Sequence, residues 1–212
     1  LINRSLVLYL VPWIMFSLVN FLEIPMISAG ANALFGAGFT FLIPMSEYGI
    51  GGFIALIGGA FADSIGRKRI VISGFMVLGI AYAVPGLFPS EPLAWYLLFA
   101  LHGVAWGIFS LMFYLVIWAD LAGNRAKERY YLIGVLPFIV SGYIQILLAP
   151  YTELISPSVA FSLASFFLFL AVLPLLYAPE TLSEKEIEKK RLKKYVEDIK
   201  TVSYTHLTLP TK

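Results

Sequence analysis

Apolar residues dominate the chain in separate blocks, and short polar or charged segments divide one block from the next. A helix needs about 20 residues to cross the hydrocarbon core of a bilayer. Six blocks have this length, so the pattern predicts six membrane-spanning helices. We place these spans at residues 5–24, 44–62, 70–88, 92–119, 130–150 and 158–178.

The stretch between the first two spans is less regular. Residues 31–42 are apolar, but the run is short and lies among three glycines. We expect Glu23 and Pro25 to close the first span. We therefore interpret residues 26–43 as an external loop or as a broken extension of a helix.

The basic residues fall on one side of the membrane when six spans are assumed. All fifteen Lys and Arg residues then lie in the same compartment as both ends of the chain. A seventh span at residues 26–43 would destroy this segregation, because every later loop would change sides. Since Lys and Arg favour the cytoplasmic side, we expect both termini to be cytoplasmic. The opposite loops contain only acidic charges, at Glu23, Glu47, Glu91 and Glu153.

Composition agrees with a membrane protein and excludes several chemistries. Hydrophobic residues make up 59% of the 212 residues and charged residues only 13%, whereas about 25% of a soluble domain is charged. The net charge of +2 is less informative than the placement of the charges. The chain has no cysteine, which excludes disulfides, iron–sulfur clusters and thiolate catalysis. We expect no cofactor, no bound metal and no nucleic-acid partner.

Both ends of the sequence differ from those of a natural membrane protein. The chain begins at Leu1, without a methionine or a signal-peptide pattern, and the first apolar block follows at once. We therefore expect an upstream part to exist. Residues 202–212 resemble one translated reading frame of a sequencing-library adapter, and an ordinary polar tail is the alternative. We expect this segment, including His206, to be non-native.

The segment after the sixth span predicts a tail helix at residues 183–201. Ser183 and Glu186 have the spacing of a capping box at its start. Apolar residues then recur on roughly one face, among several Lys and Arg residues. We interpret this segment as a cytoplasmic amphipathic helix beside the anionic leaflet, and a solvated tail helix is the alternative.

The loop between the second and third spans has a distinctive sequence. It reads Gly59-Ala-Phe-Ala-Asp63-Ser64-Ile-Gly66-Arg67-Lys68-Arg69. We expect Gly59 to allow a close approach of two helices and Gly66 to allow a sharp turn. Asp63 is placed to pair with Arg67 or to face the positive N-terminus of a neighbouring helix.

This segment resembles the signature loop of the major facilitator superfamily, which has a glycine, an acid four residues later and then Gly-Arg-Lys. The resemblance implies an all-α membrane fold in which a six-span bundle is half of a twelve-helix transporter. It also implies that the loop acts as a conformational latch. The latch residues are then Gly59, Asp63, Gly66, Arg67 and Lys68. Ser64 departs from the pattern, because the family usually has a basic residue at that position.

Three features favour the C-terminal half of such a transporter. The first half of family members usually has a buried arginine ahead of a glycine in its fourth span, whereas His102-Gly103 stands here and the span has no arginine. Pro179-Glu180-Thr181 is similar to the segment after the last helix of sugar-porter-like members. The start without methionine agrees with this position.

The family also places acid–base pairs in the next cytoplasmic loop, which here contains Asp120, Arg125, Glu128 and Arg129.

Strongly polar residues are rare inside the predicted spans, and each is informative because a polar group in hydrocarbon is costly. In the family, helices equivalent to the first, second, fourth and fifth spans line the solute cavity. Aromatic surfaces with a few polar groups suit a small organic solute. The candidate cavity residues are Asn20, His102, Trp106 and Gln145.

The same residues also allow a structural interpretation. Gly103 and Gly107 lie one turn apart and could form a helix-packing surface, with His102 hydrogen-bonded between helices. We interpret Glu23 and Glu47 as residues of the external rim. Since a histidine titrates near neutral pH, proton coupling through His102 is chemically feasible.

Together these features indicate a secondary transporter of a small organic solute in the plasma membrane, of the symporter or sugar-transporter-like type. Its expected partners are the missing N-terminal six-helix half, the lipid bilayer and a coupling proton or sodium ion. The alternatives are a non-transporting six-span protein, a homodimeric half-transporter and, less favoured, a membrane enzyme. An enzyme predicts a cluster of His, Asp, Glu or Cys near one membrane face, whereas the sequence has scattered single residues.

Overall fold

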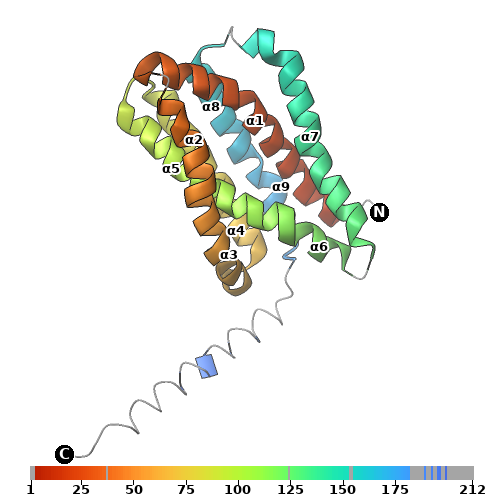
Figure 1. Cartoon of the computed structure of the whole chain (residues 1–212). Coiled ribbons are helices and arrows are strands. Elements are labelled where there is room, and N and C mark those ends of the chain that lie inside the picture. The colour runs from red at the N-terminus through yellow and green to blue at the C-terminus, as the bar shows by residue number, and fades with distance from the viewer. Residues whose placement is uncertain are drawn as a thin grey trace, which may run out of the picture.

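Figure 1 shows the computed structural model of the chain, which describes residues 3–36, 38–123, 125–152 and 155–181, together with positions 189, 192, 195, 196 and 199. The described residues form helices and turns, without a strand. The predicted tail helix at residues 183–201 and the adapter-like segment 202–212 lie outside the continuous described ranges. The helical elements are α1 (Arg4–Phe35), η1 (Phe39–Phe41), α2 (Leu42–Met45), η2 (Ser46–Ile50), α3 (Gly51–Ile65), α4 (Arg67–Leu87), α5 (Pro92–Phe109), η3 (Ser110–Val116), α6 (Ile117–Ala122), α7 (Lys127–Thr152), α8 (Pro157–Leu170) and α9 (Val172–Tyr177).

Six helical stretches in the described part of the chain are long and apolar enough to cross a membrane. Several of them join consecutive elements, because η2 and η3 are short π-helical segments inside otherwise continuous helices. The six stretches confirm the predicted number of spans and a multi-pass helical bundle. They are Arg4–Phe35, Phe39–Ile65, Arg67–Leu87, Pro92–Ala122, Lys127–Tyr151 and Pro157–Tyr177.

The first span is longer than the sequence suggested. α1 continues through Glu23 and Pro25, which we expected to end it, and stops only before Gly36. Tertiary packing explains the extension, because Ala31 is fully buried and an added Cβ on Gly30 would lie 2.9 Å from the Trp95 ring. The external-loop interpretation of residues 26–43 is therefore wrong, and the alternative of a broken helix extension is confirmed.

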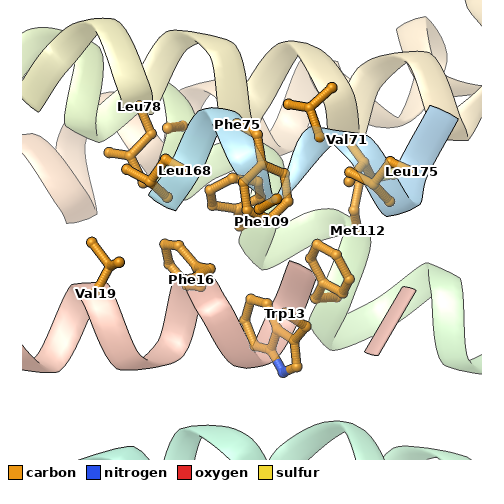
Figure 2. Close-up of a cluster of buried hydrophobic side chains, with 14 of the residues drawn as sticks. Trp13, Phe16, Val19, Val71, Phe75, Leu78, Phe109, Met112, Leu168 and Leu175 are labelled. Atoms are coloured by element: carbon orange, nitrogen blue, oxygen red, sulfur yellow. The ribbon is translucent and has the colours of Figure 1, made fainter. Parts of the chain in front are cut away.

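Aromatic side chains fill the centre of the bundle. The Trp13 ring of α1 stacks on Phe113 of η3, with centroids 4.5 Å apart, and its indole N–H donates a 2.6 Å hydrogen bond to the Gly134 carbonyl of α7. Phe16, one turn later, packs against Phe109 of α5 at 4.6 Å. Figure 2 shows Trp13, Phe16 and Phe109 gathered between the helices. Such pairs contribute about 0.5–1.5 kcal/mol each beyond the area that they bury, which matters where lipid removes the usual hydrophobic driving force.

Burial is uneven among the six spans. Only 11% of the most apolar window of Phe39–Ile65 and 17% of that of Lys127–Tyr151 is buried, against 39–50% in the other four spans. Large side chains such as Leu56 on α3 and Ile146 on α7 are therefore exposed on the bundle surface. In Figure 1, α2 and α7 lie toward opposite sides of the bundle. The second and fifth spans thus present broad unpartnered faces.

The second and fourth spans meet through glycines. An added Cβ on Gly103 would lie 2.5 Å from the Ser46 carbonyl oxygen, and one on Gly107 would lie 2.5 Å from the carbonyl oxygen of Gly51. Both values are far below van der Waals contact, so the backbones of α5 and of η2–α3 touch directly. This geometry confirms that Gly103 and Gly107 form a packing surface. The accompanying expectation of a hydrogen bond from His102 is not met at its Nδ1 atom, which has no hydrogen-bond partner among the described residues.

Replacing Gly107 with alanine should destabilise the bundle. The new methyl group would have to displace the Gly51 carbonyl or Ile54, and overpacking of this kind costs about 1–3 kcal/mol. That cost exceeds the roughly 1 kcal/mol by which alanine is favoured over glycine inside a helix. We expect Gly107→Ala to lower the unfolding temperature in detergent by about 2–4 °C for each kcal/mol lost.

The matched control for this change is Gly52→Ala, also in a helix of the second span. An added Cβ at Gly52 would meet nothing within 4 Å, so the unfolding temperature should stay the same or rise. Equal decreases for the two variants would contradict the backbone contact.

Candidate functional site

The turn between the second and third spans consists of a single residue. α3 ends at Ile65 and α4 begins at Arg67, so Gly66 alone reverses the chain, with φ at 112° and ψ at 137°. Side chains with a Cβ rarely adopt such a positive φ, whereas glycine does so without strain. The predicted role of Gly66 in a sharp turn is confirmed.

Arg67 joins the ends of three spans. Its guanidinium forms an ion pair and hydrogen bond with Asp120 of α6, and a second ion pair of 3.4 Å with Asp63 of α3. The Arg67 side chain is 16% exposed and that of Asp120 is 19% exposed, so both charges are only partly hydrated. The predicted pairing of Asp63 with Arg67 is confirmed. Asp120 is an additional partner that the loop sequence does not contain.

Glu180 caps the start of the third span. Its carboxylate accepts hydrogen bonds from the backbone N–H of Arg67 at 3.0 Å and of Lys68 at 3.2 Å. These are N–H groups at a helix start, which have no partner inside their own helix, and the negative charge suits the positive end of the helix dipole. The segment Pro179-Glu180-Thr181 therefore binds directly to the loop that resembles the family signature.

Lys68, at the start of the third span, binds the end of the sixth span in return. Its ammonium donates hydrogen bonds to the carbonyls of Leu176 at 2.9 Å and Ala178 at 2.8 Å, at the end of α9. The third span therefore caps the C-terminus of the sixth, while Glu180 after the sixth caps the N-terminus of the third. The Tyr9 hydroxyl donates a 2.8 Å hydrogen bond to the Pro179 carbonyl and attaches the first span to the same place.

These groups form one charged cluster at a single end of the bundle. We define the charged cluster as Asp63, Arg67, Lys68, Asp120 and Glu180. Through its side chains and the Tyr9 hydroxyl, it connects the ends of the first, second, third, fourth and sixth spans.

Gly59 does not have the expected role within the described bundle. An added Cβ at this position would meet nothing within 4 Å, so the prediction of a close helix approach there is wrong. The tight contacts of α3 with the rest of the bundle are instead made through Gly51 and Gly58. Ser64, at the position where the family has a basic residue, donates a 3.0 Å hydrogen bond to the Phe61 carbonyl instead.

His102 faces a carboxylate from another span. The His102 Nδ1 atom lies 3.7 Å from the Glu47 Oε1 atom of η2, and the two side chains are 5% and 23% exposed. This places Glu47 against the fourth span. The His102 ring also lies near Tyr82 of α4, with centroids 6.2 Å apart, in an edge-on arrangement.

The other candidate cavity residues are only partly brought together. The Trp106 ring lies 6.3 Å from that of His102 and 5.5 Å from that of Phe16, and its buried Nε1 has no hydrogen-bond partner among the described residues. Asn20 is buried on α1, and Gln145 is half-buried on α7. No ring contact or hydrogen bond within the described ranges joins Gln145 to the other three.

Glu23 is also placed differently from our expectation. Its side chain is buried, with 5% exposure, and its Oε2 atom has no hydrogen-bond partner among the described residues. The interpretation of Glu23 as a rim residue did not include this burial inside the bundle. Sequence reading missed this because a charge between two apolar blocks is normally the end of a span, whereas α1 continues beyond it.

The fold and these sites define a multi-pass helical membrane protein with a charged cluster at one end. A scan against models of protein families found no match, and a search of curated proteins found no relative. The function of the chain therefore has to follow from its own sequence and geometry.

Removing the Glu180 cap should weaken the contact between the third and sixth spans. Loss of a helix N-cap costs about 0.5–2 kcal/mol, so we expect Glu180→Ala to lower the unfolding temperature in detergent by several degrees. The control is Glu91→Ala, because Glu91 occupies the N-cap position of α5 without a side-chain capping bond. If both variants unfolded at the temperature of the unmodified chain, the cap would have no role in stability.

Proposed function

We propose that the chain is one half of a secondary transporter that moves a small organic solute across the plasma membrane by alternating access. In this mechanism, the six-span bundle rocks against a second six-span bundle around a site near the middle of the membrane. The observation that supports the proposal most strongly is the charged cluster, in which Arg67 and Glu180 bind the ends of several spans at one face.

The chemistry of the charged cluster suits a conformational latch. Its ion pairs are partly exposed, so water can replace a broken contact at modest cost, and each charge-assisted hydrogen bond is worth only about 1.5–3 kcal/mol. A bundle held in this way at one face can exist in two arrangements that differ by a few kcal/mol. Such a small difference is what binding of a solute can reverse.

The uneven burial of the spans supports a second bundle as the partner. The faces of α3 and α7 have few contacts in the described bundle, and Gly59 on α3 leaves room for a close neighbour. In the proposed transporter these two spans contact the other half. The resemblance of the signature loop and the ending Pro179-Glu180-Thr181 favours the C-terminal half for this chain.

The proposed solute site lies among the interior faces of the first, fourth and fifth spans. His102 supplies a polar group whose Nδ1 atom lies 3.7 Å from the Glu47 carboxylate, and Trp106 supplies an aromatic surface whose N–H has no partner among the described residues. A site with apolar walls and a few polar groups is typical for small organic molecules. A proton or a sodium ion is the candidate coupling ion.

The proposed orientation places the charged cluster in the cytoplasm. Because the chain has no cysteine, single cysteines can report the side of each loop. Ser90 lies exposed between the third and fourth spans, and Ala126 lies exposed between the fourth and fifth. In intact cells, a membrane-impermeant maleimide should label Ser90→Cys but label Ala126→Cys only after the membrane is permeabilised. The reverse pattern would overturn the orientation.

The latch predicts a specific loss of transport. In cells that express the complete gene, at least one solute of a broad radiolabelled panel should accumulate, and a protonophore should reveal whether protons drive the uptake. We expect Arg67→Gln to reduce the initial uptake rate at least tenfold, because one guanidinium holds the ends of three spans.

Arg129→Gln is the matched control, since Arg129 is an exposed arginine outside the charged cluster. Membrane levels of both variants are measured by immunoblot, so that a folding defect is not counted as lost transport. Normal uptake by Arg67→Gln at equal membrane level would refute the latch. An upstream gene region without further spans would refute the fused half.

A further inference from the structure

A cavity lies between the first, fifth and sixth spans, toward the end of the bundle opposite the charged cluster. Its volume is about 340 Å³, and α1, α7 and α8 contribute its walls. The walls are almost entirely apolar, with Leu148, Leu163 and Phe167 among the lining residues. This volume falls in the range of about 300–1,000 Å³ that is typical of small-molecule sites.

Glu23 is the one acidic residue among the described residues that line this cavity. Its side chain is only 5% exposed, and its Oε2 atom has no hydrogen-bond partner among the described residues. A charged carboxylate in such surroundings is costly, so the group either takes up a proton or needs a positive charge or hydrogen-bond donors beside it. An ionisable group inside a membrane span therefore marks a functional site whose partner has to be identified.

The basic residues of the described spans and their connecting loops are too far away to be this partner. Arg4, at the start of α1, lies on the same helix but about 28 Å from Glu23 at a rise of 1.5 Å per residue. Lys127 begins α7, whereas the cavity contacts that helix near Leu148 and Tyr151, at its other end. The remaining arginines and lysines of the described spans and loops lie at the end of the bundle that contains the charged cluster.

The composition of the walls selects the kind of cation. A small inorganic cation needs several oxygen ligands around it, and one carboxylate among aliphatic and aromatic side chains does not provide them. A cation with apolar substituents would match both the Glu23 carboxylate and the apolar walls. Its charge would pair with the carboxylate, and its substituents would contact the walls. Phe167 and Tyr151 add aromatic rings, whose faces attract organic cations.

We propose that this cavity is a binding site for a lipophilic organic cation, with the Glu23 carboxylate as its counter-charge. The site is separate from the contact between His102 and Glu47. It does not rest on the proposed function, because binding to it requires neither a second bundle nor alternating access.

Equilibrium dialysis of radiolabelled tetraphenylphosphonium against the purified full chain tests the proposal. The measurement is made in an uncharged detergent without added lipid, so that no ammonium headgroup competes for the site. We expect saturable binding of one cation per chain. Glu23→Gln should weaken it at least tenfold, because the variant keeps the shape of the side chain and removes its charge.

Three controls separate charge from shape and from folding. Glu23→Asp keeps the charge and should bind within a few-fold of the unmodified chain, and Glu91→Gln removes an exposed carboxylate away from the cavity and should bind normally. Triphenylmethanol, a neutral molecule with similar rings, should not displace the cation at equal concentration. The unfolding temperature of each variant is measured alongside.

A cavity-filling variant gives an independent test if Glu23→Gln does not fold. Ala160→Leu should reduce binding at least tenfold with the carboxylate intact, because Ala160 lines the cavity. No saturable binding by the unmodified chain, or equal affinity for the chain and a folded Glu23→Gln, would overturn the proposal. Transport assays do not enter these outcomes, so the cation site and the proposed function can fail separately.

Discussion

The reciprocal contact between the third and sixth spans is the interaction on which the arrangement of the bundle depends. Glu180 accepts hydrogen bonds from the N–H groups at the start of α4, and Lys68 donates hydrogen bonds to the carbonyls at the end of α9. Each residue supplies what the other helix end lacks, and the helix dipoles favour both charges. Arg67 then extends this contact to the second and fourth spans. One end of the bundle is thus stabilised by ion pairs and hydrogen bonds, whereas the interior is stabilised mainly by close packing of glycines and aromatic rings.

In the interior, close fit predominates over polar bonding, and Trp13 and Ser165 each donate a buried hydrogen bond to a backbone carbonyl of another span. Glycines let the second and fourth spans touch backbone to backbone, and the aromatic rings around Trp13 fill the space between the first, fourth and fifth spans. These contacts leave few polar groups in the centre. The main exceptions are His102, Glu47 and Glu23. Their surroundings are apolar, so a charged neighbour would interact with them more strongly than it would in water.

The sequence predicted the local features well and the distant ones poorly. Hydropathy and charge placement gave the six spans, and Gly66 and the pair Asp63–Arg67 followed from spacing within a few residues. The contacts of Arg67 with Asp120 and Glu180 join residues 53 and 113 positions apart, and a single sequence contains no signal for such pairs. Glu23 was misplaced because hydropathy treats a charge as a boundary, while the packing of Ala31 and Gly30 continues the helix past it.

The bond between Tyr9 and Pro179 brings the beginning and the end of the bundle side by side. With an even number of crossings, both ends of the bundle open onto the same face. A second bundle of the same kind can therefore be joined by a short linker that never enters the bilayer. Two such units joined in tandem therefore need no additional crossing segment between them to have the same orientation. The geometry at Tyr9 makes this unit suited to duplication.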